Sequence, residues 1–302
     1  MSGRFLDALA HSALVLDGAM GTQLYERGIP LTASYEELNL SRPDTIRSLH
    51  EDYLRAGARV LETNTFGANS TRLGRHGLEG DVRALNLAGV TRAREAMQAA
   101  GIDAFVAGAM GPTGLSAANW MESQQREIGD GFRAQAEALA EAGVDLLMIE
   151  TMLQPIELTL AVEAAKRTGL PVVAHACFIK GVMADGTTPE AIATRLFDLG
   201  ADVIGANCGE GPTELLAIAE RMLAHHRVPI SIAPNAGLPQ RGPRDEGAIE
   251  DRLVYPATPE EFQRLARRLF DLGVRIVGGC CGSTPDHIRE IAAAASTTAR
   301  AD

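Results

Sequence analysis

The sequence has neither the long apolar runs of a membrane protein nor the basic runs of a nucleic-acid-binding protein. No segment approaches the roughly eighteen consecutive apolar residues of a membrane span, and residues 1–5 do not begin a signal peptide. The formal net charge of −11 also disfavours nucleic acid, whose binding needs clustered lysine and arginine. We therefore expect a cytoplasmic protein that contacts neither a membrane nor nucleic acid.

Cysteine is scarce, and no Cys-x-x-Cys pair occurs among Cys177, Cys208, Cys280 and Cys281. So few thiols in 302 residues do not form a disulfide framework, and their spacing disfavours a closed structural zinc site. A disulfide between the adjacent Cys280 and Cys281 would have strained geometry. Cys177 is interpreted as a small buried hydrophobic residue.

A Gly-x-Gly-x-x-Gly motif is also missing after the first apolar run, so a dinucleotide-binding fold has no local support. Instead, short apolar runs recur, each followed by a helical pattern, at residues 14–16, 60–62, 105–107, 146–149, 172–175, 203–205, 230–232 and 275–277. This alternation indicates parallel strands covered by helices. The sequence predicts an α/β protein, a (β/α)8 TIM barrel forming a single domain over residues 1–302, with a doubly wound open sheet as the alternative.

Helix boundaries are marked at both ends. Proline in the first turn marks helix starts in segments 41–43, 188–190 and 258–260. A further helix is predicted over residues 127–142. All four helices end on a glycine C-cap that leads directly into the next strand, in segments 56–58, 142–144, 199–201 and 272–274.

Reactive polar side chains follow seven of the eight predicted strands. In a barrel the active site lies at the carboxyl ends of the strands, so we expect these groups to surround one opening. They are Asp17, Glu62, Glu150, His175, Asn207 with Cys208, Asn235, and Cys280 with Cys281. Within this set, His175 is interpreted as a core or wall residue and Glu62 as an architectural one.

Cys208, Cys280 and Cys281 form the predicted metal site. Neighbouring side chains on a regular strand point to opposite faces, so Cys280 and Cys281 face one point only where the flanking glycines let the chain bend. Three thiolates with one open position suit zinc. Such a zinc is a poor Lewis acid for making hydroxide, but it binds a thiol and keeps it nucleophilic. The pattern therefore favours alkyl transfer onto sulfur over hydrolysis.

The same opening has groups suited to an amino acid. The carboxylates of Asp17 and Glu150 are placed to meet an ammonium group. Backbone N–H groups of the loop 17–22 are placed to meet a small anion. Together they predict an amino acid substrate.

Several motifs together resemble the zinc-dependent homocysteine S-methyltransferases. This family of barrels includes the homocysteine module of cobalamin-dependent methionine synthase and betaine–homocysteine methyltransferase. The matching stretches span nearly the whole chain, at residues 16–22, 38–44, 62–66, 111–113, 149–151, 207–208, 234–239 and 278–282. The resemblance implies methyl transfer to homocysteine to form methionine. It also implies that Cys208, Cys280 and Cys281 are the catalytic zinc ligands and that the substrate sulfur is the fourth ligand.

The resemblance further implies the substrate contacts. Asp17 and Glu150 would contact the amino acid end of homocysteine, and Asn235 would fill the fourth zinc position when substrate is absent. The full set of predicted substrate-binding residues is Asp17, Gly18, Ala19, Met20, Thr63, Phe66, Glu150 and Asn235.

The methyl donor is expected from outside the chain, because the folate and cobalamin domains of methionine synthase have no counterpart before Asp302. It would be a small onium compound, such as betaine or S-methylmethionine, or a methyl-corrinoid on a separate protein. An onium donor would favour an aromatic wall. Aromatic residues are only 4% of the chain, but Phe66, Trp120, Phe178 and Tyr255 fall in predicted loops after strands.

Other interpretations stay open at this stage. The enzyme would methylate another thiol or a selenol, or the chain would be a non-catalytic zinc- or thiol-binding subunit of a corrinoid methyltransferase complex. The long segment 237–258 is interpreted as a lid or an interface arm, and a homo-oligomer is possible.

Overall fold

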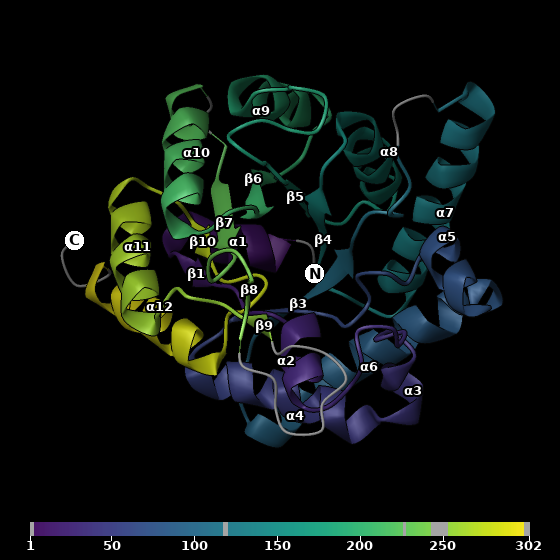
Figure 1. Cartoon of the computed structure of the whole chain (residues 1–302), viewed down its shortest axis with the longest axis horizontal. Helices are drawn as coiled ribbons and strands as arrows, with labels where there is room; N and C mark the ends of the chain where they lie inside the picture. The colour runs from purple at the N-terminus through teal and green to yellow at the C-terminus, as the bar shows by residue number, and fades with distance from the viewer. Residues whose placement is uncertain (1–2, 117–119, 226–227, 243–252, 299–302) are drawn as a thin grey trace.

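The computed structural model describes residues 3–116, 120–225, 228–242 and 253–298. Eight parallel strands form one sheet in the order β1-β10-β7-β6-β5-β4-β3-β2. A parallel bridge between Leu16 and Val60 joins β1 to β2, and the sheet closes into a barrel (Figure 1). The strands are β1 (Leu14–Val15), β2 (Val60–Glu62), β3 (Phe105–Met110), β4 (Leu146–Met152), β5 (Val172–Ala176), β6 (Val203–Cys208), β7 (Ile230–Pro234) and β10 (Ile276–Val277). The predicted (β/α)8 barrel is confirmed, and the alternative of an open sheet is wrong.

Long helices surround the barrel (Figure 1). They are α4 (Pro43–Ala56), α6 (Val82–Ala100), α7 (Glu122–Glu141), α8 (Pro155–Lys166), α9 (Pro189–Asp198), α10 (Pro212–His225), α11 (Pro259–Asp271) and α12 (Pro285–Thr298). Short elements decorate the connections: α2 (Gly21–Glu26), α3 (Leu38–Ser41), α5 (Ser70–Leu73), the 3₁₀ turns η1 (Gly74–His76) and η2 (Glu79–Asp81), and an antiparallel pair of β8 (Gln240–Arg241) and β9 (Leu253–Val254).

Most of the predicted helix boundaries are confirmed. The three proline starts are the first residues of α4, α9 and α11, and Thr188 and Thr258 cap two of them through their side chains. Gly57, Gly143, Gly200 and Gly273 all have positive φ, as the C-cap prediction requires. The prediction for α7 was wrong at its start, because the helix begins at Glu122. Its first turn is exposed and polar, so it has no apolar periodicity to reveal it.

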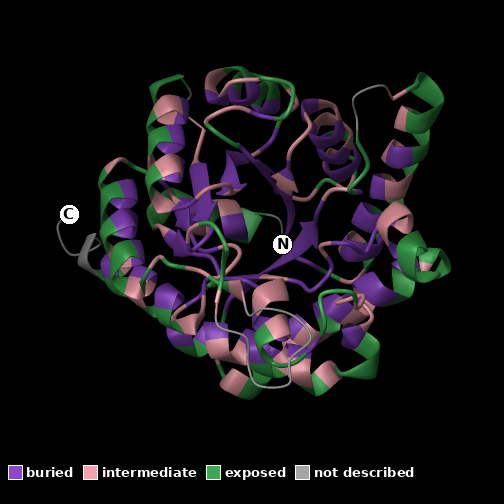
Figure 2. Ribbon diagram, viewed as in Figure 1, coloured by how far each residue is buried: buried purple, intermediate pink, exposed green. Residues whose placement is uncertain are grey.

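The strands are buried along most of their length (Figure 2), and their alternating side chains form two apolar clusters. Inward side chains such as Leu14, Met148 and Val173 fill the barrel, and α1 (Gly3–His11) closes its amino end with Phe5 and Leu9. Outward side chains pack against the surrounding helices. The amino end of the barrel is therefore filled by apolar side chains, which leaves the carboxyl end for a cavity.

Within the residues that the structure describes, no helix combines the length and the apolar character needed to cross a membrane.

Candidate metal and substrate site

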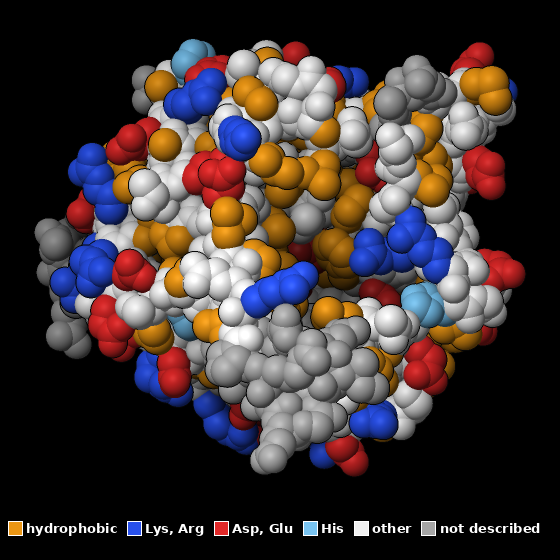
Figure 3. Space-filling model, in the orientation of Figure 1, with side chains coloured by type: hydrophobic (Ala, Val, Ile, Leu, Met, Phe, Trp, Pro, Cys, Tyr) orange, Lys and Arg blue, Asp and Glu red, His pale blue; other side chains and the backbone are white. Residues whose placement is uncertain are grey.

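One cavity of about 560 Å³ opens at the carboxyl ends of the strands. Figure 3 shows this face of the molecule hollowed near its centre. The cavity is lined by side chains from the ends of β1, β2, β4 and β6 and from the loop after β10, where a barrel builds its active site. Most of the site residues predicted from the sequence line it: Asp17, Gly18, Ala19, Met20, Thr63, Phe66, Glu150, Cys208, Cys280 and Cys281. Asn235 is not part of the lining; its Nδ2 donates to the Gly209 carbonyl at 2.8 Å.

The three predicted metal ligands converge. The Sγ atoms of Cys208, Cys280 and Cys281 lie within 4.8 Å of one another, and all three cysteines are free thiols. A tetrahedral zinc with Zn–S bonds of about 2.3 Å holds its sulfurs roughly 3.8 Å apart. The three sulfurs therefore fit such an ion after only a small contraction.

Unusual backbone brings these sulfurs together. Cys208 has a φ of 64°, a left-handed backbone conformation that residues other than glycine rarely adopt. The loop after β10 approaches its neighbours closely. A Cβ on Gly278 would lie 2.8 Å from the Asp17 carbonyl oxygen, and one on Gly279 would lie 2.4 Å from Ser283 Oγ. β10 ends at Val277 and Gly282 has a φ of 79°, so the chain leaves strand geometry around the two cysteines as predicted, and Gly278 permits close contact with the loop after β1.

Hydrogen bonds give the three sulfurs different acidities. The pKa of Cys208 is held far below its usual value because the thiol of Cys177, and then those of Cys280 and Cys281, donate to its sulfur. The pKa of Cys280 is raised well above the usual value by its bond to Cys208, and that of Cys281 is raised to about 12 by the same partner. The three sulfurs are therefore linked by hydrogen bonds through which they share their protons.

Cys177 is buried, as the sequence predicted, and it has a contact that the sequence did not reveal. It follows β5, whose Ala176 pairs with Ala206 of β6, so that Cys177 and Cys208 stand at adjacent strand ends. Its hydrogen bond to Cys208 raises the pKa of the Cys177 thiol far above its usual value. Cys177 is not one of the three converging sulfurs. A residue that hydrogen-bonds to a metal ligand orients that ligand and changes its basicity, and Cys177 is placed to do this for Cys208.

Three carboxyl groups, Asp17, Glu62 and Glu150, lie in the same cavity, and we call them the acidic floor. Asp17 Oδ2 accepts the Glu62 backbone N–H at 3.0 Å, while Asp17 Oδ1 is buried without a partner among the described residues. Burial raises the pKa of all three groups, that of Glu150 to about 8. No described arginine or lysine forms an ion pair with them. The floor therefore offers unneutralised carboxyl oxygens to a cationic ligand.

Asn207 joins the floor to the sulfurs. Its Nδ2 lies 3.3 Å from Glu150 Oε2, 2.9 Å from Thr151 Oγ1 and 3.7 Å from Cys280 Sγ. Its Oδ1 accepts the Thr151 N–H at 2.7 Å, and Thr151 has a φ of 59°. Asn207 thus fixes the ends of β4 and β6 relative to each other. The sequence placed it at a strand end but gave it no role, because pairing between strands is not visible locally.

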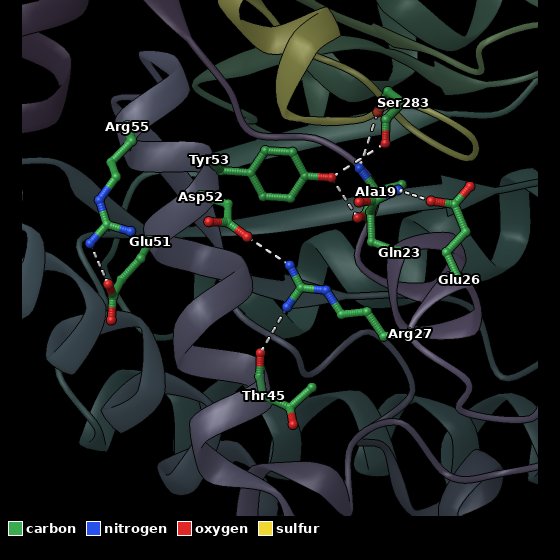
Figure 4. A network of polar contacts seen from close by, with 10 residues as sticks. All are labelled: Ala19, Gln23, Glu26, Arg27, Thr45, Glu51, Asp52, Tyr53, Arg55 and Ser283. Carbon is green, nitrogen blue, oxygen red and sulfur yellow. Dashed lines mark hydrogen bonds and ion pairs between the residues drawn. The ribbon is translucent and has the colours of Figure 1, made fainter.

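Hydrogen bonds connect the loop after β1 (the β1 loop) with the loop after β10 that holds Cys280 and Cys281 (the cysteine loop), and Tyr53 of α4 takes part in them (Figure 4). The Tyr53 hydroxyl donates to the Ala19 carbonyl at 2.7 Å, and Ser283 Oγ accepts the Ala19 N–H at 3.1 Å. Ser283 Oγ also donates to the Cys280 carbonyl at 2.8 Å. The Ala19 amide is therefore engaged within the protein. The prediction of an anion site on this loop then rests on its other amides.

The remaining candidates differ in their surroundings. Thr63 Oγ1 hydrogen-bonds Thr65 Oγ1 at 2.6 Å and accepts the Ala109 N–H at 3.1 Å, so its hydroxyl holds the end of β2 in place. Tyr255 packs on Gly282, and burial and the charge of Cys281 raise its pKa to about 12. His175 is fully buried inside the barrel and its pKa is lowered to about 3 by burial, which agrees with a core histidine. Trp120 packs against the helix side of the core.

Comparisons with known proteins found relatives that match nearly the whole chain. A methionine synthase of Mycobacterium tuberculosis is 36% identical over 98% of this chain, and the match covers 26% of the relative's length. An S-methylmethionine–homocysteine S-methyltransferase of Rattus norvegicus is 34% identical over 92% of this chain and 77% of its own. The metallated form of the Escherichia coli homocysteine methyltransferase MmuM superposes with a TM-score of 0.79 at 25% identity, covering 97% of this chain and 99% of that one.

The chain spans about a quarter of the length of the methionine synthases that it matches. The match to the homocysteine S-methyltransferase sequence family covers residues 14–295, which includes every strand of the barrel and all three converging cysteines. The chain belongs to the homocysteine S-methyltransferase family.

Proposed function

We propose that this protein transfers a methyl group to the thiol of homocysteine, forming methionine, at a zinc ion held by Cys208, Cys280 and Cys281. The observation that carries this proposal is the presence of three converging sulfurs and an unneutralised acidic floor in one cavity. The names of the relatives support the same activity, because they include methionine synthases and an S-methylmethionine–homocysteine methyltransferase.

The acidic floor gives the proposal its substrate. The unpartnered Oδ1 of Asp17 and the carboxyl of Glu150 are acceptors for the ammonium group of an amino acid. An ammonium ion would pair with the ionised carboxylates by charge-assisted hydrogen bonds and would favour the charged form that burial alone disfavours. Homocysteine carries this group close to its thiol, while a thiol without an ammonium group leaves the floor unpaired. This difference favours homocysteine over other thiols.

A bound zinc would supply a site that lowers the pKa of the substrate thiol and keeps its sulfur nucleophilic at neutral pH. The chain's own residues do the rest. Asn207 fixes Glu150 relative to Cys280, and the pair Tyr53 and Ser283 fixes the Asp17 loop relative to the cysteine loop. Holding the amino end and the sulfur at fixed positions reduces the entropic cost of reaching the transition state.

The methyl donor enters as a second substrate. The homocysteine sulfur attacks the methyl carbon, a C–S bond forms, and the bond from the methyl group to the donor atom breaks. The electron pair of the breaking bond stays with the donor atom, which leaves with the demethylated donor. The thiol proton of homocysteine leaves to solvent when the thiol is ionised, so the displacement itself needs no protein group to accept or give a proton.

The test is direct. Zinc-loaded protein is incubated with homocysteine and, separately, with betaine, S-methylmethionine, methyl-folate or methylcobalamin, and methionine is measured. Metal content is measured in parallel on wild type, Cys208→Ala and the control Arg55→Gln, whose exposed side chain pairs with Glu51 on α4 outside the cavity. We expect one zinc per chain in wild type and in the control, none in Cys208→Ala, and methionine with at least one donor. Methionine formation by zinc-free Cys208→Ala at the wild-type rate would contradict the proposal.

A further inference from the structure

Three basic side chains border the mouth of the cavity. Arg72, Arg75 and His76 line it from α5 and η1, and we call them the basic rim. Arg72 is half-buried, and the other two are exposed. This grouping contrasts with the net charge of −11 of the whole chain and with the acidic floor below it. Figure 3 shows basic side chains gathered beside the hollow.

Arg72 is held over an aromatic ring. Asn69 caps α5 by accepting the Arg72 backbone N–H at 2.9 Å, which fixes where the side chain begins. The Arg72 guanidinium carbon lies 5.1 Å from the centroid of the Phe66 ring. The ring in turn packs on Gly111, where a Cβ would lie 2.4 Å from ring atoms. The guanidinium therefore covers the ring of Phe66, the kind of surface on which an onium cation would bind.

Arg75 is positioned without being neutralised. Its Nη2 donates to the carbonyl oxygens of Thr113 at 3.1 Å and Gly114 at 2.9 Å. These acceptors are uncharged, and within the described part of the chain neither Arg72 nor Arg75 forms an ion pair with a carboxylate. The carboxylates nearby serve the backbone instead. Glu36 Oε1 accepts the Gly67 N–H at 2.7 Å, and Glu157 Oε1 accepts the Thr113 N–H at 2.7 Å. Glu157 interacts with the charge of Arg72 without an ion pair between them, so both guanidinium groups keep N–H donors for a ligand.

A further donor comes from the segment beside Phe66, where the Tyr35 carbonyl accepts Asn64 Nδ2 at 2.6 Å. The hydroxyl of Tyr35 is buried and has no hydrogen-bond partner among the described residues, although Tyr35 lines the cavity. Its ring lies beside Gly21 of the β1 loop, 3.2 Å from where a Cβ would be. A buried hydroxyl without a partner is costly unless a ligand or water supplies one. Besides the sulfurs and the acidic floor, the cavity thus offers two guanidinium groups and a hydroxyl donor.

The cavity is large enough for two ligands. A volume of about 560 Å³ is typical of pockets that enclose a drug-sized molecule, and homocysteine is much smaller. If the proposed function holds, homocysteine occupies the floor and the sulfurs, and the methyl donor occupies the rest. We propose that Arg72, Arg75 and Tyr35 form a subsite for an oxyanion of the methyl donor, either a carboxylate or a phosphate. The carboxylate would belong to a small onium donor and the phosphate to a corrinoid.

The subsite is tested first by binding alone, without turnover. Wild type, Arg72→Gln and Arg55→Gln are titrated with acetate and with inorganic phosphate, and binding is followed by NMR. Arg55→Gln is the matched control, since Arg55 is exposed on α4 and pairs with Glu51 outside the cavity (Figure 4). We expect Arg72→Gln to weaken binding of one of the two anions about tenfold, the effect of losing a charge-assisted hydrogen bond, and the control to leave it unchanged. Equal binding of both anions by wild type and Arg72→Gln overturns the proposal.

Donor pairs then identify the source of the anion. Dimethylsulfonioacetate and trimethylsulfonium share a reactive methyl group and differ in the carboxylate. Methylcobalamin carries a phosphate in its nucleotide loop, and methylcobinamide lacks that phosphate together with the attached ribose and base. We expect Arg72→Gln to raise the KM of the anionic member of one pair about tenfold. The KM of its partner, the KM of homocysteine and kcat should change less than about twofold. An equal rise for both members of each pair overturns the subsite.

The two proposals fail in different ways. Loss of methionine formation with every donor, in zinc-loaded protein that still binds homocysteine, contradicts methyl transfer, and the anion titrations alone then decide the subsite. Normal methyl transfer with no effect of Arg72→Gln on any anion contradicts the subsite and leaves the proposed function standing.

Discussion

The floor of the cavity is acidic and buried, whereas the rim is basic and open to solvent. Asp17 and Glu150 are buried, at 1% and 9% exposure, and burial raises their pKa. Arg72 and Arg75 lie at the mouth, where solvent screens them. Charge interactions are much stronger in a buried site than at the surface. We therefore expect the floor to dominate substrate affinity and the rim to adjust the choice of donor.

The largest effect is expected where the floor meets the sulfurs. Cys281→Ala removes one of three converging sulfurs, and we expect loss of zinc and a fall in activity of more than about a hundredfold. Changes to residues that merely support a metal ligand cost about 10–100-fold, so loss of a ligand should cost more. Metal analysis and steady-state rates check this. Full activity without bound metal would refute the assignment.

Asp17→Asn comes next. It keeps the size of the side chain and its acceptor for the Glu62 N–H, but it removes the negative charge. We expect the KM for homocysteine to rise about 10–100-fold with a smaller effect on kcat, because a hydrogen bond to a charged group contributes about 1.5–3 kcal/mol. A homocysteine KM equal to that of wild type would remove Asp17 from the site.

Glu150→Gln separates the contribution of Glu150 to the pH dependence of homocysteine binding from that of Asp17. Burial raises the pKa of Glu150 to about 8, so below that pH the carboxyl is neutral and must lose its proton before it pairs with an ammonium group. Homocysteine affinity should therefore increase as the pH rises toward 8, by up to about tenfold per unit. Calorimetry in buffers of different ionisation enthalpy should count about one proton fewer released at pH 7 in Glu150→Gln. An equal count in both proteins would contradict this role.

The smallest expected effect is that of salt on the wild-type protein, which should differ between the rim and the floor. Raising NaCl from about 0.05 M to 0.5 M shortens the Debye length from above 10 Å to below 5 Å, which screens exposed charges far more than buried ones. We expect the KM of an anionic donor to rise roughly two- to threefold and the KM of homocysteine to stay within twofold. The opposite pattern would mean that the rim does not touch the donor.

Much of the site was predictable because its signals are local. The glycines around Cys280 and Cys281 indicate a bend, and polar residues after apolar runs indicate strand ends. The structure brings these residues into one cavity. The place of Asn207 was not predictable, because its contacts with Glu150 and Cys280 join residues 57 and 73 positions apart. The same holds for the contact between Cys177 and Cys208, which depends on the register of β5 with β6.

The basic rim was not predictable from the sequence either. Arg72 and Arg75 occur in a segment whose composition is unremarkable, and only the fold places that segment over the cavity. Phe66 was predicted to contact substrate, but the sequence gave no sign that Arg72 covers its ring. Phe66, Arg72 and Arg75 are close in sequence, but they face the same cavity only because of the conformation of the loop that holds them.

The sequence by itself determined the barrel, the three candidate metal ligands and the acids Asp17 and Glu150, because strand periodicity, glycine caps and residue chemistry are properties of short segments. Only the tertiary structure decided which of these groups meet. Closure of the sheet between Leu16 and Val60 sets all strand ends around one opening. Register then decides which neighbours touch, since a shift of one residue turns a side chain to the opposite face. The separation of an acidic floor from a basic rim follows from that closure.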